Sequence, residues 1–281
     1  ARVSPVLSIY ANTSNSLGAG PLLYCGTEEQ KRNYVIPVAK GEKILVFALT
    51  EPGAGSDAGG TLTTAVPDED DFILNGRKTF ISGAPFADYA VVYAKTDPSQ
   101  KGSKGISMFL VDMKLPGVSC GKPEHKMGIV GYPTSDIILE DVHVHKSDLL
   151  GPLHKGFSTA MKTLDGGRLG MAAQAVGIAQ GCLDASVKYA KERKQFGKPI
   201  IQFPAIYEIL TNMKAKLYAS RAMLYETARF VEIYKCWAEI GKERPLTAEE
   251  KSEMKAYNKL ADAFTPLCKM FASEYANQLA Y

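Results

Sequence analysis

The chain has 281 residues and a net charge of +3, with 46% hydrophobic and 22% charged residues. This length allows two or three packed units, and the composition is that of an ordinary soluble globular protein. So small a charge argues against nucleic-acid binding, and no apolar run approaches the roughly 20 residues of a membrane-spanning helix. The five cysteines lie far apart with no C-x-x-C pair, which is typical of reduced thiols in an intracellular protein.

Residues 1–42 are predicted to be helical. Thr27 followed by Gln30 is a candidate capping box, in which each residue satisfies the other's free backbone N–H at a helix start. The helix that it opens is expected to run through Ala39, and Gly41 ends it.

Residues 43–150 are predicted to form β-structure, because short apolar runs alternate with turn residues and no long helical pattern intervenes. We expect a small antiparallel barrel or sandwich. Asn75-Gly76 is a hairpin signal, predicted to lead a strand from Lys78 to Ser82 back beside Phe72. The strand-like runs are Phe72–Leu74, Tyr89–Ala94, Ile106–Val111 and Ile137–Leu139.

His143 and His145 would share one face of a strand, as a pair of metal ligands can. No third ligand accompanies them in the sequence, so we expect no metal site.

Residues 151–281 are predicted to be a helical bundle. A long helix is expected from Gly156 to Arg193, a loop around Pro245, and a final helix from about Thr247 toward Tyr281. Between them, apolar residues recur at the three- and four-residue steps of a bundle seam, namely Leu210, Met213, Leu217, Leu224 and Val231.

The segment that organises the chain is an apolar run, Ile44–Leu49, followed by the loop Thr50–Asp57 with the sequence Thr-Glu-Pro-Gly-Ala-Gly-Ser-Asp. Glycines let a backbone approach a ligand closely, and successive N–H groups in such a loop can cradle an anion. Taken alone, the loop could equally be a plain tight turn.

The loop and the motifs after it, in their order and spacing, resemble the acyl-CoA dehydrogenase family, and most of all its short-chain, butyryl-type members. The resemblance covers nearly the whole chain and implies that both ends of the family's fold are missing. That fold has a helical N-terminal part, a central β domain and a C-terminal antiparallel helix bundle, here 1–42, 43–150 and 151–281. The further matching motifs are Asn75–Gly83, Lys126–Ile129, Leu164–Arg168 and Glu192–Gly197.

The resemblance implies an FAD-dependent enzyme that dehydrogenates a short- to medium-chain acyl-CoA to the trans-2-enoyl-CoA and passes electrons to an electron-transfer flavoprotein. Such reactions belong to fatty acid β-oxidation. Two alternatives stay open: the enoyl-CoA reductase component of an electron-bifurcating flavoprotein complex, and a non-catalytic homologue that binds flavin or acyl-CoA.

The resemblance also implies the site residues. Ser56, Asp165 and Arg168 would contact the acyl-CoA; the alternative for the last two is an internal ion pair on one helix face. For Phe80 and Ser82 the alternatives are a core aromatic and a solvated hydroxyl, and for Arg193 a solvated helix end. The residues implied for flavin binding are Phe47, Leu49, Thr50, Gly55, Ser56, Phe80, Ile81, Ser82, Arg193 and Phe196.

Two positions depart from the family pattern. Pro204 stands where many members have a glutamine that contacts the flavin, and Gly167 stands where one branch carries its catalytic glutamate. Glycine cannot accept a proton, so we expect no catalytic base in this segment and a glutamate beyond Tyr281 instead. Glu51 is expected to matter through its loop position and not as the base.

The family's assembly gives the remaining expectations. Arg193 and Phe196 would reach a flavin held mainly by a neighbouring subunit, which implies a homotetramer built as a dimer of dimers. The expected compartment is the bacterial cytoplasm, or the mitochondrial matrix if the source is eukaryotic.

Overall fold

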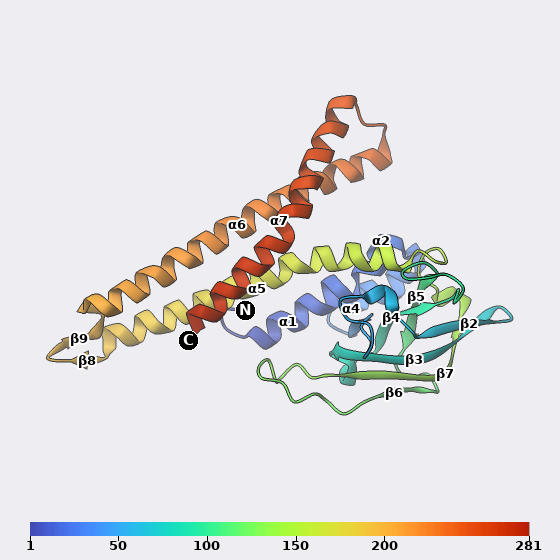
Figure 1. The fold of residues 1–281 in the computed structure, drawn as a ribbon, viewed down its shortest axis with the longest axis horizontal. Helices are drawn as coiled ribbons and strands as arrows, with labels where there is room; N and C mark the ends of the chain where they lie inside the picture. Colours follow the sequence, from blue (N-terminus) through green and yellow to red (C-terminus); the bar gives the residue numbers. More distant parts are fainter. Residues whose placement is uncertain (281) are drawn as a thin grey trace. The chain divides into compact units, whose positions relative to one another are not determined.

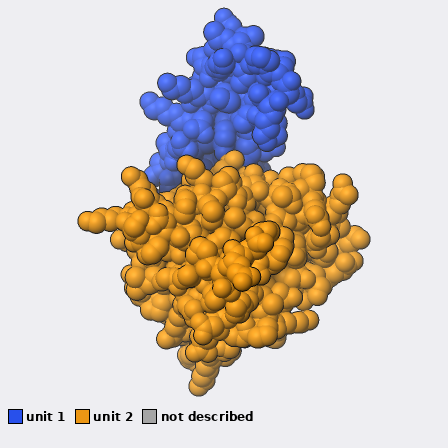
Figure 2. Space-filling model, turned by 90° about the vertical axis from the view of Figure 1, so that its right-hand side faces the viewer, with its two compact units in different colours: residues 1–8, 168–281 blue, residues 9–167 orange. Residues whose placement is uncertain are grey.

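The computed structural model describes residues 1–280. By its contacts the chain divides into two compact units, coloured separately in Figure 2: unit 1 contains residues 1–8 and the chain from Arg168 onward, and unit 2 contains Ile9–Gly167. These limits differ from the boundaries at 42 and 150 that we expect for domains, and those boundaries stay a prediction. No helix among the described residues is long and apolar enough to cross a membrane.

The N-terminal residues form short helical elements, as predicted: α1 (Pro5–Asn12), the π-helical η1 (Thr13–Gly18), α2 (Gly20–Cys25), α3 (Glu28–Gln30), the π-helical η2 (Lys31–Val35) and α4 (Ile36–Ala39). The capping box is present, with the Gln30 N–H donating to Thr27 Oγ1 at 3.1 Å and the Thr27 N–H donating to Gln30 Oε1 at 2.9 Å. Gly41 ends α4 at a φ of +75°.

A curled seven-stranded sheet follows in unit 2 (Figure 1). Its strands lie in the order β1-β4-β2-β3-β7-β6, with β5 paired to β4. The predicted β-structure is confirmed, and most pairs are antiparallel, but β1 and β4 run parallel. The strands are β1 (Leu45–Ala48), β2 (Thr64–Asp68), β3 (Asp71–Ser82), β4 (Tyr89–Lys95), β5 (Ile106–Asp112), β6 (Val118–Cys120) and β7 (Thr134–His145).

Strand β4 is hydrophobic from Ala90 to Ala94, where both of its faces are buried. Ala90, Val92 and Ala94 face a core made by the sheet itself. Val91 and Tyr93 face a second core, which the sheet shares with α2 and the first turns of α5 (Gly156–Glu192).

The predicted hairpin at Asn75-Gly76 is wrong. Strand β3 runs unbroken through both residues, and the turn lies earlier, between β2 and β3 at Glu69-Asp70. Gly76 instead marks a register shift against β7, with a φ of +153° and with Thr63 so close that a Cβ would lie 2.5 Å from its hydroxyl oxygen. The glycine serves a bulge and a close backbone approach, which the same dipeptide signal also fits.

Unit 1 is built from the rest of α5, a small hairpin of β8 (Lys194–Gln195) and β9 (Lys198–Pro199), and two long helices, α6 (Pro204–Glu243) and α7 (Ala248–Ala280). The long helices confirm the predicted bundle, and Met213, Leu217 and Leu224 of the predicted seam are buried in its core with residues of α5 and α7. Two polar residues interrupt the seam and donate to carbonyls four residues earlier in the helix, Ser220 to Lys216 and Thr227 to Met223.

Candidate functional site

The glycine-rich loop leaves β1 at Ala48 and makes a tight turn. Backbone hydrogen bonds of 3.1 Å join Glu51 and Ala54 in both directions, so Pro52 and Gly53 form the tip. Gly53 and Gly55 are exposed, and an added Cβ would meet nothing within 4 Å at either glycine. The loop therefore offers open backbone to a ligand at its outer side.

Beneath the loop lies a buried ion pair. Lys78 of β3 is 0% exposed and its Nζ lies 2.7 Å from Glu51 Oε1, while Glu51 is 5% exposed. The Glu51 carboxylate also accepts hydrogen bonds from the backbone N–H groups of Leu62 and Thr63 and from the hydroxyls of Thr61 and Thr63. With its oxygens engaged in this way, Glu51 has no role as an acceptor for a substrate proton.

The two pKa values of this pair keep both groups charged at neutral pH. Burial alone would raise the pKa of Glu51, but the charge of Lys78 and the hydrogen bonds that the carboxylate accepts lower it to about 2. Burial lowers the pKa of Lys78 to about 8, against the attraction of Glu51.

Phe80 is aimed outward by a bulge in β3. The register against β7 shifts between Lys78 and Ile81, and Phe80 sits in the shift at a φ of +57° with 64% of its surface exposed. The interpretation of Phe80 as a core aromatic is therefore wrong. Its neighbour Thr79 donates its N–H to the Thr50 carbonyl at 2.9 Å, which joins the bulge to the start of the glycine-rich loop.

The end of β3 is tied to the chain before β7. The Ser82 hydroxyl lies 3.2 Å from Thr134 Oγ1, and the Tyr132 hydroxyl donates to the Ser82 carbonyl at 3.3 Å. Ser82 is half-buried and Ile81 is buried in the sheet core. Phe80 and Ser82 thus face away from that core on either side of Ile81.

The other residues expected in unit 2 divide into buried and exposed ones. Phe47 packs on Tyr93 with ring centroids 5.0 Å apart, and Leu49 is buried in the core shared with α2. Ser56 is exposed in the loop, beside Gly55. We call the rim of unit 2 the surface formed by Phe80, which is joined through Thr79 to Thr50, and by the exposed Gly55 and Ser56 of the same loop. The side chains of Leu49 and Ile81 are buried behind it, and that of Phe47 is half-buried.

Arg193 and Phe196 belong to unit 1. Phe196 stands at the tip of the β8–β9 hairpin, 92% exposed, at a φ of +50°, and its ring centroid is 6.0 Å from that of Phe203. Arg193 is exposed just after α5, and its carbonyl accepts the N–H of Ile200 at 2.8 Å.

Helix α5 carries the remaining candidates. Asp165 is exposed in unit 2 and Arg168 is half-buried in unit 1. Gly167 is buried, and a Cβ added there would lie 2.7 Å from Leu17 Cδ2. A glutamate at this position would require Leu17 to move, so both the glycine and its packing argue against a base here.

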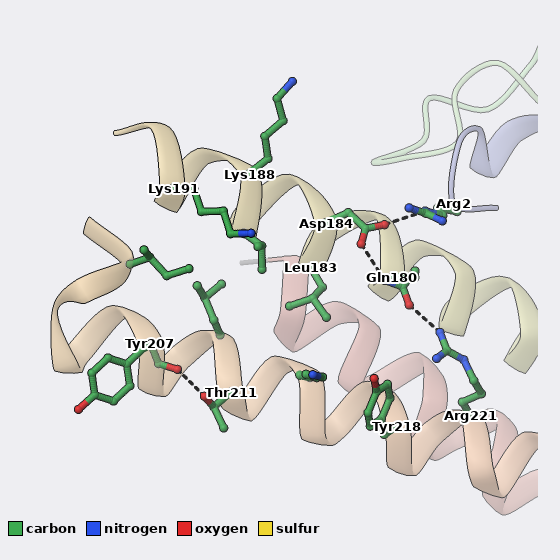
Figure 3. A pocket seen from close by; sticks show the side chains of 14 residues that line it. Arg2, Gln180, Leu183, Asp184, Lys188, Lys191, Tyr207, Thr211, Tyr218 and Arg221 are labelled. Carbon is green, nitrogen blue, oxygen red and sulfur yellow. Dashed lines mark hydrogen bonds and ion pairs between the residues drawn. The ribbon is translucent and has the colours of Figure 1, made fainter. Parts of the chain in front are cut away.

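Unit 1 contains an open cavity of about 720 Å³ between α5 and α6 (Figure 3). A chain of polar contacts crosses it: Arg2 pairs with Asp184 at 2.7 Å, Gln180 donates to Asp184 at 2.8 Å, and Arg221 donates to Gln180 at 2.7 Å. The side chain of Lys188 points away from these residues. No candidate that the sequence suggests lies in this cavity.

Lys78 and its threonine partners are absent from the residues that the sequence suggests. A signal was available, because alternation along a strand with Phe72 inward also turns Lys78 inward, and a buried lysine needs a partner. The described residues hold no group of three or more His, Cys, Asp or Glu side chains that could bind a metal ion.

Family models describe three successive parts of the chain. The acyl-CoA dehydrogenase N-terminal domain matches residues 1–42, the middle domain matches 46–142, and the C-terminal domain matches 154–281.

Two relatives among characterised proteins are reductases by name. A 3-(aryl)acrylate reductase of Clostridium sporogenes is 60% identical over 81% of this chain and 60% of its own length. A subunit of the caffeyl-CoA reductase–Etf complex of Acetobacterium woodii is 59% identical over 83% of this chain and 61% of its own length. The chain thus spans about three fifths of the length of these relatives.

Solved structures share the fold. Butyryl-CoA dehydrogenase of Megasphaera elsdenii is 36% identical, with a TM-score of 0.78 over 100% of this chain and 71% of its own. An acyl-CoA dehydrogenase of Bacillus anthracis complexed with FAD is 37% identical, with a TM-score of 0.82 over 96% of this chain and 45% of its own. With helices, curled sheet and helical bundle in the same order, and with matches to all three domain models, the chain belongs to the acyl-CoA dehydrogenase family.

Proposed function

We propose that this chain is part of an FAD-dependent oxidoreductase that interconverts an acyl-CoA and its 2-enoyl-CoA, and that its physiological direction is reduction of the enoyl-CoA. The observation that carries the proposal is the rim of unit 2, where the exposed ring of Phe80 is tied through Thr79 and Thr50 to a glycine-rich loop with open backbone. A planar cofactor needs such a combination of an aromatic face and unobstructed N–H groups.

The residues of this rim fit FAD. Phe80 would lie against the isoalloxazine ring, with Thr50, Gly55, Ser56 and the Ser82 hydroxyl lining its edge. The buried side chains of Leu49 and Ile81 and the half-buried Phe47 would act by supporting this surface. FAD supplies the hydride chemistry when bound, and the chain supplies its placement and a dry environment.

Arg193 and Phe196 would bind the other end of a flavin held mainly by a neighbouring subunit. A guanidinium fork suits a pyrophosphate, and an aromatic ring 92% exposed at a hairpin tip is available to stack on an adenine. This role requires an oligomer, and we propose a homotetramer arranged as a dimer of dimers.

Asp165, Arg168 and Ser56 would contact the acyl-CoA. Acidity at the carbon next to the thioester has to be raised by donors aimed at the carbonyl, and a proton has to be moved by a desolvated carboxylate. Glu51 cannot be that carboxylate because its oxygens are engaged, and Gly167 has no carboxylate to offer. We therefore propose a glutamate beyond Tyr281.

The reductive direction is supported by the names of the relatives. The two proteins near 60% identity are an arylacrylate reductase and a subunit of a caffeyl-CoA reductase–Etf complex, whereas the butyryl-CoA dehydrogenase is 36% identical. We therefore favour a 2-enoyl-CoA as substrate and an electron-transfer flavoprotein as electron donor. Dehydrogenation of a short- to medium-chain acyl-CoA, the direction implied by the sequence motifs, is the second candidate.

The test uses the full-length protein purified without added cofactor. We expect a bound flavin whose visible band, once reduced anaerobically, returns quickly with cinnamoyl-CoA and more slowly with crotonyl-CoA. The matched saturated compounds, 3-phenylpropionyl-CoA and butyryl-CoA, are added to the oxidised protein in the same way. Rapid bleaching by butyryl-CoA without reoxidation by either enoyl-CoA would favour the dehydrogenase. A protein without flavin would refute both candidates.

A further inference from the structure

Lys78 and Glu51 lie where the glycine-rich loop, the chain entering β2 and the β3 bulge meet. We propose that this buried pair is a positioning device for the flavin: it fixes Phe80 and the glycine-rich loop at one spacing, without touching the cofactor. The inference rests on the proposed function, since it concerns how the same rim is held.

Lys78 links three separate segments. Its ammonium group donates to the Leu49 carbonyl at 3.2 Å, to Glu51 Oε1 at 2.7 Å and to Thr61 Oγ1 at 3.0 Å. An ammonium group has three donors, and each has an acceptor here. The end of β1, the glycine-rich loop and the chain entering β2 are therefore held around one atom of β3.

Glu51 completes the links on the loop side. Its carboxylate accepts the Leu62 N–H at 2.6 Å, the Thr63 N–H at 3.0 Å and the Thr63 hydroxyl at 2.5 Å, besides the Thr61 hydroxyl. These contacts close the loop from residue 51 to residue 63 into a rigid ring. Gly53, Gly55 and Ser56 are among the exposed residues of that ring.

Phe80 points against the direction that a regular strand would give it. In a regular strand, residues two apart share a face, so Phe80 would point inward with Lys78. Here Lys78 and Thr79 are both buried, and only the register shift and the positive φ turn Phe80 outward. The inward anchor at Lys78 and the Thr79–Thr50 hydrogen bond together hold the part of the strand that leads into the bulge.

Stability alone gives no reason for a buried charged pair such as Lys78 and Glu51. Buried ion pairs are commonly no more stable than neutral groups of similar volume, although removing one partner is costly. A pair that is retained in the interior, directly beneath an exposed aromatic ring and a ligand loop, has its explanation in the geometry that it imposes.

The test compares single and double variants of the full-length holoprotein. Lys78→Met leaves Glu51 buried without its cation, so that variant measures mainly folding. The double variant Lys78→Met with Glu51→Gln is neutral, keeps an acceptor for the Leu62 and Thr63 N–H groups, and removes the links to Leu49 and Thr61. We expect it to melt near the wild-type temperature, to raise the FAD Kd by about tenfold, and to change the visible circular dichroism of bound flavin.

A control pair in unit 2 lies away from the rim. Lys43 pairs with Asp88 at 2.8 Å on a half-exposed surface, near the starts of β1 and β4. We expect Lys43→Met to leave the FAD Kd and the flavin dichroism as in the wild type.

The outcomes separate this inference from the proposed function. A wild-type protein without flavin would reject the proposed function and this inference with it. A flavin-bound wild type with a folded double variant of unchanged Kd and dichroism would overturn the positioning role alone. If the double variant does not fold, Thr61→Val decides: a Kd raised by about threefold supports the role, and an unchanged Kd overturns it.

Discussion

Two exposed phenylalanines of this chain have almost the same backbone φ, but the contacts that support them are very different. Phe80 has a φ of +57° and Phe196 a φ of +50°, and both rings face outward. Beneath Phe80 lies the Lys78–Glu51 pair with the hydrogen bonds around it. Phe196 has only the hairpin of β8 and β9 and an edge contact with Phe203.

This difference indicates which of the two surfaces has a fixed shape before a ligand binds. The unit 2 rim is held by buried contacts from three segments, so its shape exists before a ligand binds. The hairpin tip in unit 1 presents an aromatic ring without such an anchor, which suits a group that closes onto a ligand supplied from elsewhere. Four predictions test this difference between the two surfaces.

The largest effect is expected from removing the cation under Phe80. Lys78→Met leaves a buried carboxylate unpaired, which should lower the free energy of unfolding by about 3–5 kcal/mol. Arg193→Met removes an exposed cation at the hairpin and should change it by less than about 0.5 kcal/mol. Urea unfolding followed by circular dichroism gives both values. Similar losses in the two variants would remove the distinction between the surfaces.

The acid dependence of stability tests the same anchor from its carboxylate side, because protonating Glu51 takes the negative charge away from Lys78. The folded-state pKa of Glu51 is about 2 against an ordinary 4.5, so between these values the unfolded chain binds the extra proton. Ionisation of Glu51 therefore makes a pH-dependent contribution of about 3 kcal/mol to stability, which is complete above pH 4.5 and is lost as the pH falls toward 2.

By pH 3 about 2 kcal/mol of that contribution should be gone. The measurement is the difference in free energy of unfolding between the wild type and the double variant Lys78→Met with Glu51→Gln, from pH 6 to pH 3. An exposed carboxyl on α6 provides the control, since Glu226→Gln changes neither the pair nor unit 2. A difference that stays constant with pH would show that Glu51 titrates normally.

Two glycines with nearly the same φ separate backbone strain from crowding. Gly83 follows β3 at a φ of +84°, where a Cβ would lie 2.6 Å from the Tyr132 hydroxyl oxygen. Gly197 follows Phe196 at +80° with nothing within 4 Å. Gly83→Ala should cost about 2–3 kcal/mol and Gly197→Ala about 1 kcal/mol, because only the first adds a clash to the strained φ.

Thermal unfolding of the two alanine variants, read at the wild-type melting temperature, gives this comparison. Equal costs at the two positions would mean that the chain around Tyr132 relaxes as freely as the hairpin tip.

The sequence predicts the helices and strands of this fold well, but it predicts their turns and bulges poorly. Apolar runs and helical periodicity place the strands and the three long helices, and the Thr27–Gln30 capping box is where its motif predicts. These features depend on neighbours a few residues apart. The bulge at Phe80 depends on pairing with β7, more than fifty residues later. The turn at Glu69-Asp70 is local, between β2 and β3, but the Asn75-Gly76 pattern fits a bulge as well as a hairpin and so points to the wrong place.

The candidate site divides in the same way. Motifs suggest Phe80, Ser56 and Phe196, and the structure finds all three exposed. The pairing of Lys78 with Glu51 joins residues 27 positions apart, and it follows only once β3 is laid beside the end of β1. A motif names the residues that could face a ligand; the buried contacts beneath them come from tertiary structure.

The smallest effect is expected from truncating the two rings, and it bears most directly on flavin binding. Both side chains are exposed, so Phe80→Ala and Phe196→Ala should each change the free energy of unfolding by less than about 0.5 kcal/mol. Phe80→Ala should raise the FAD Kd by about tenfold at any protein concentration, because stacking on a ring is worth about 1 kcal/mol or slightly more. Phe196→Ala should raise it only where subunits associate, if the flavin that it contacts is held by another chain, as we propose. Flavin fluorescence across a dilution series measures both, and a Phe196→Ala effect that persists in the fully dissociated protein would mean that the hairpin serves its own subunit.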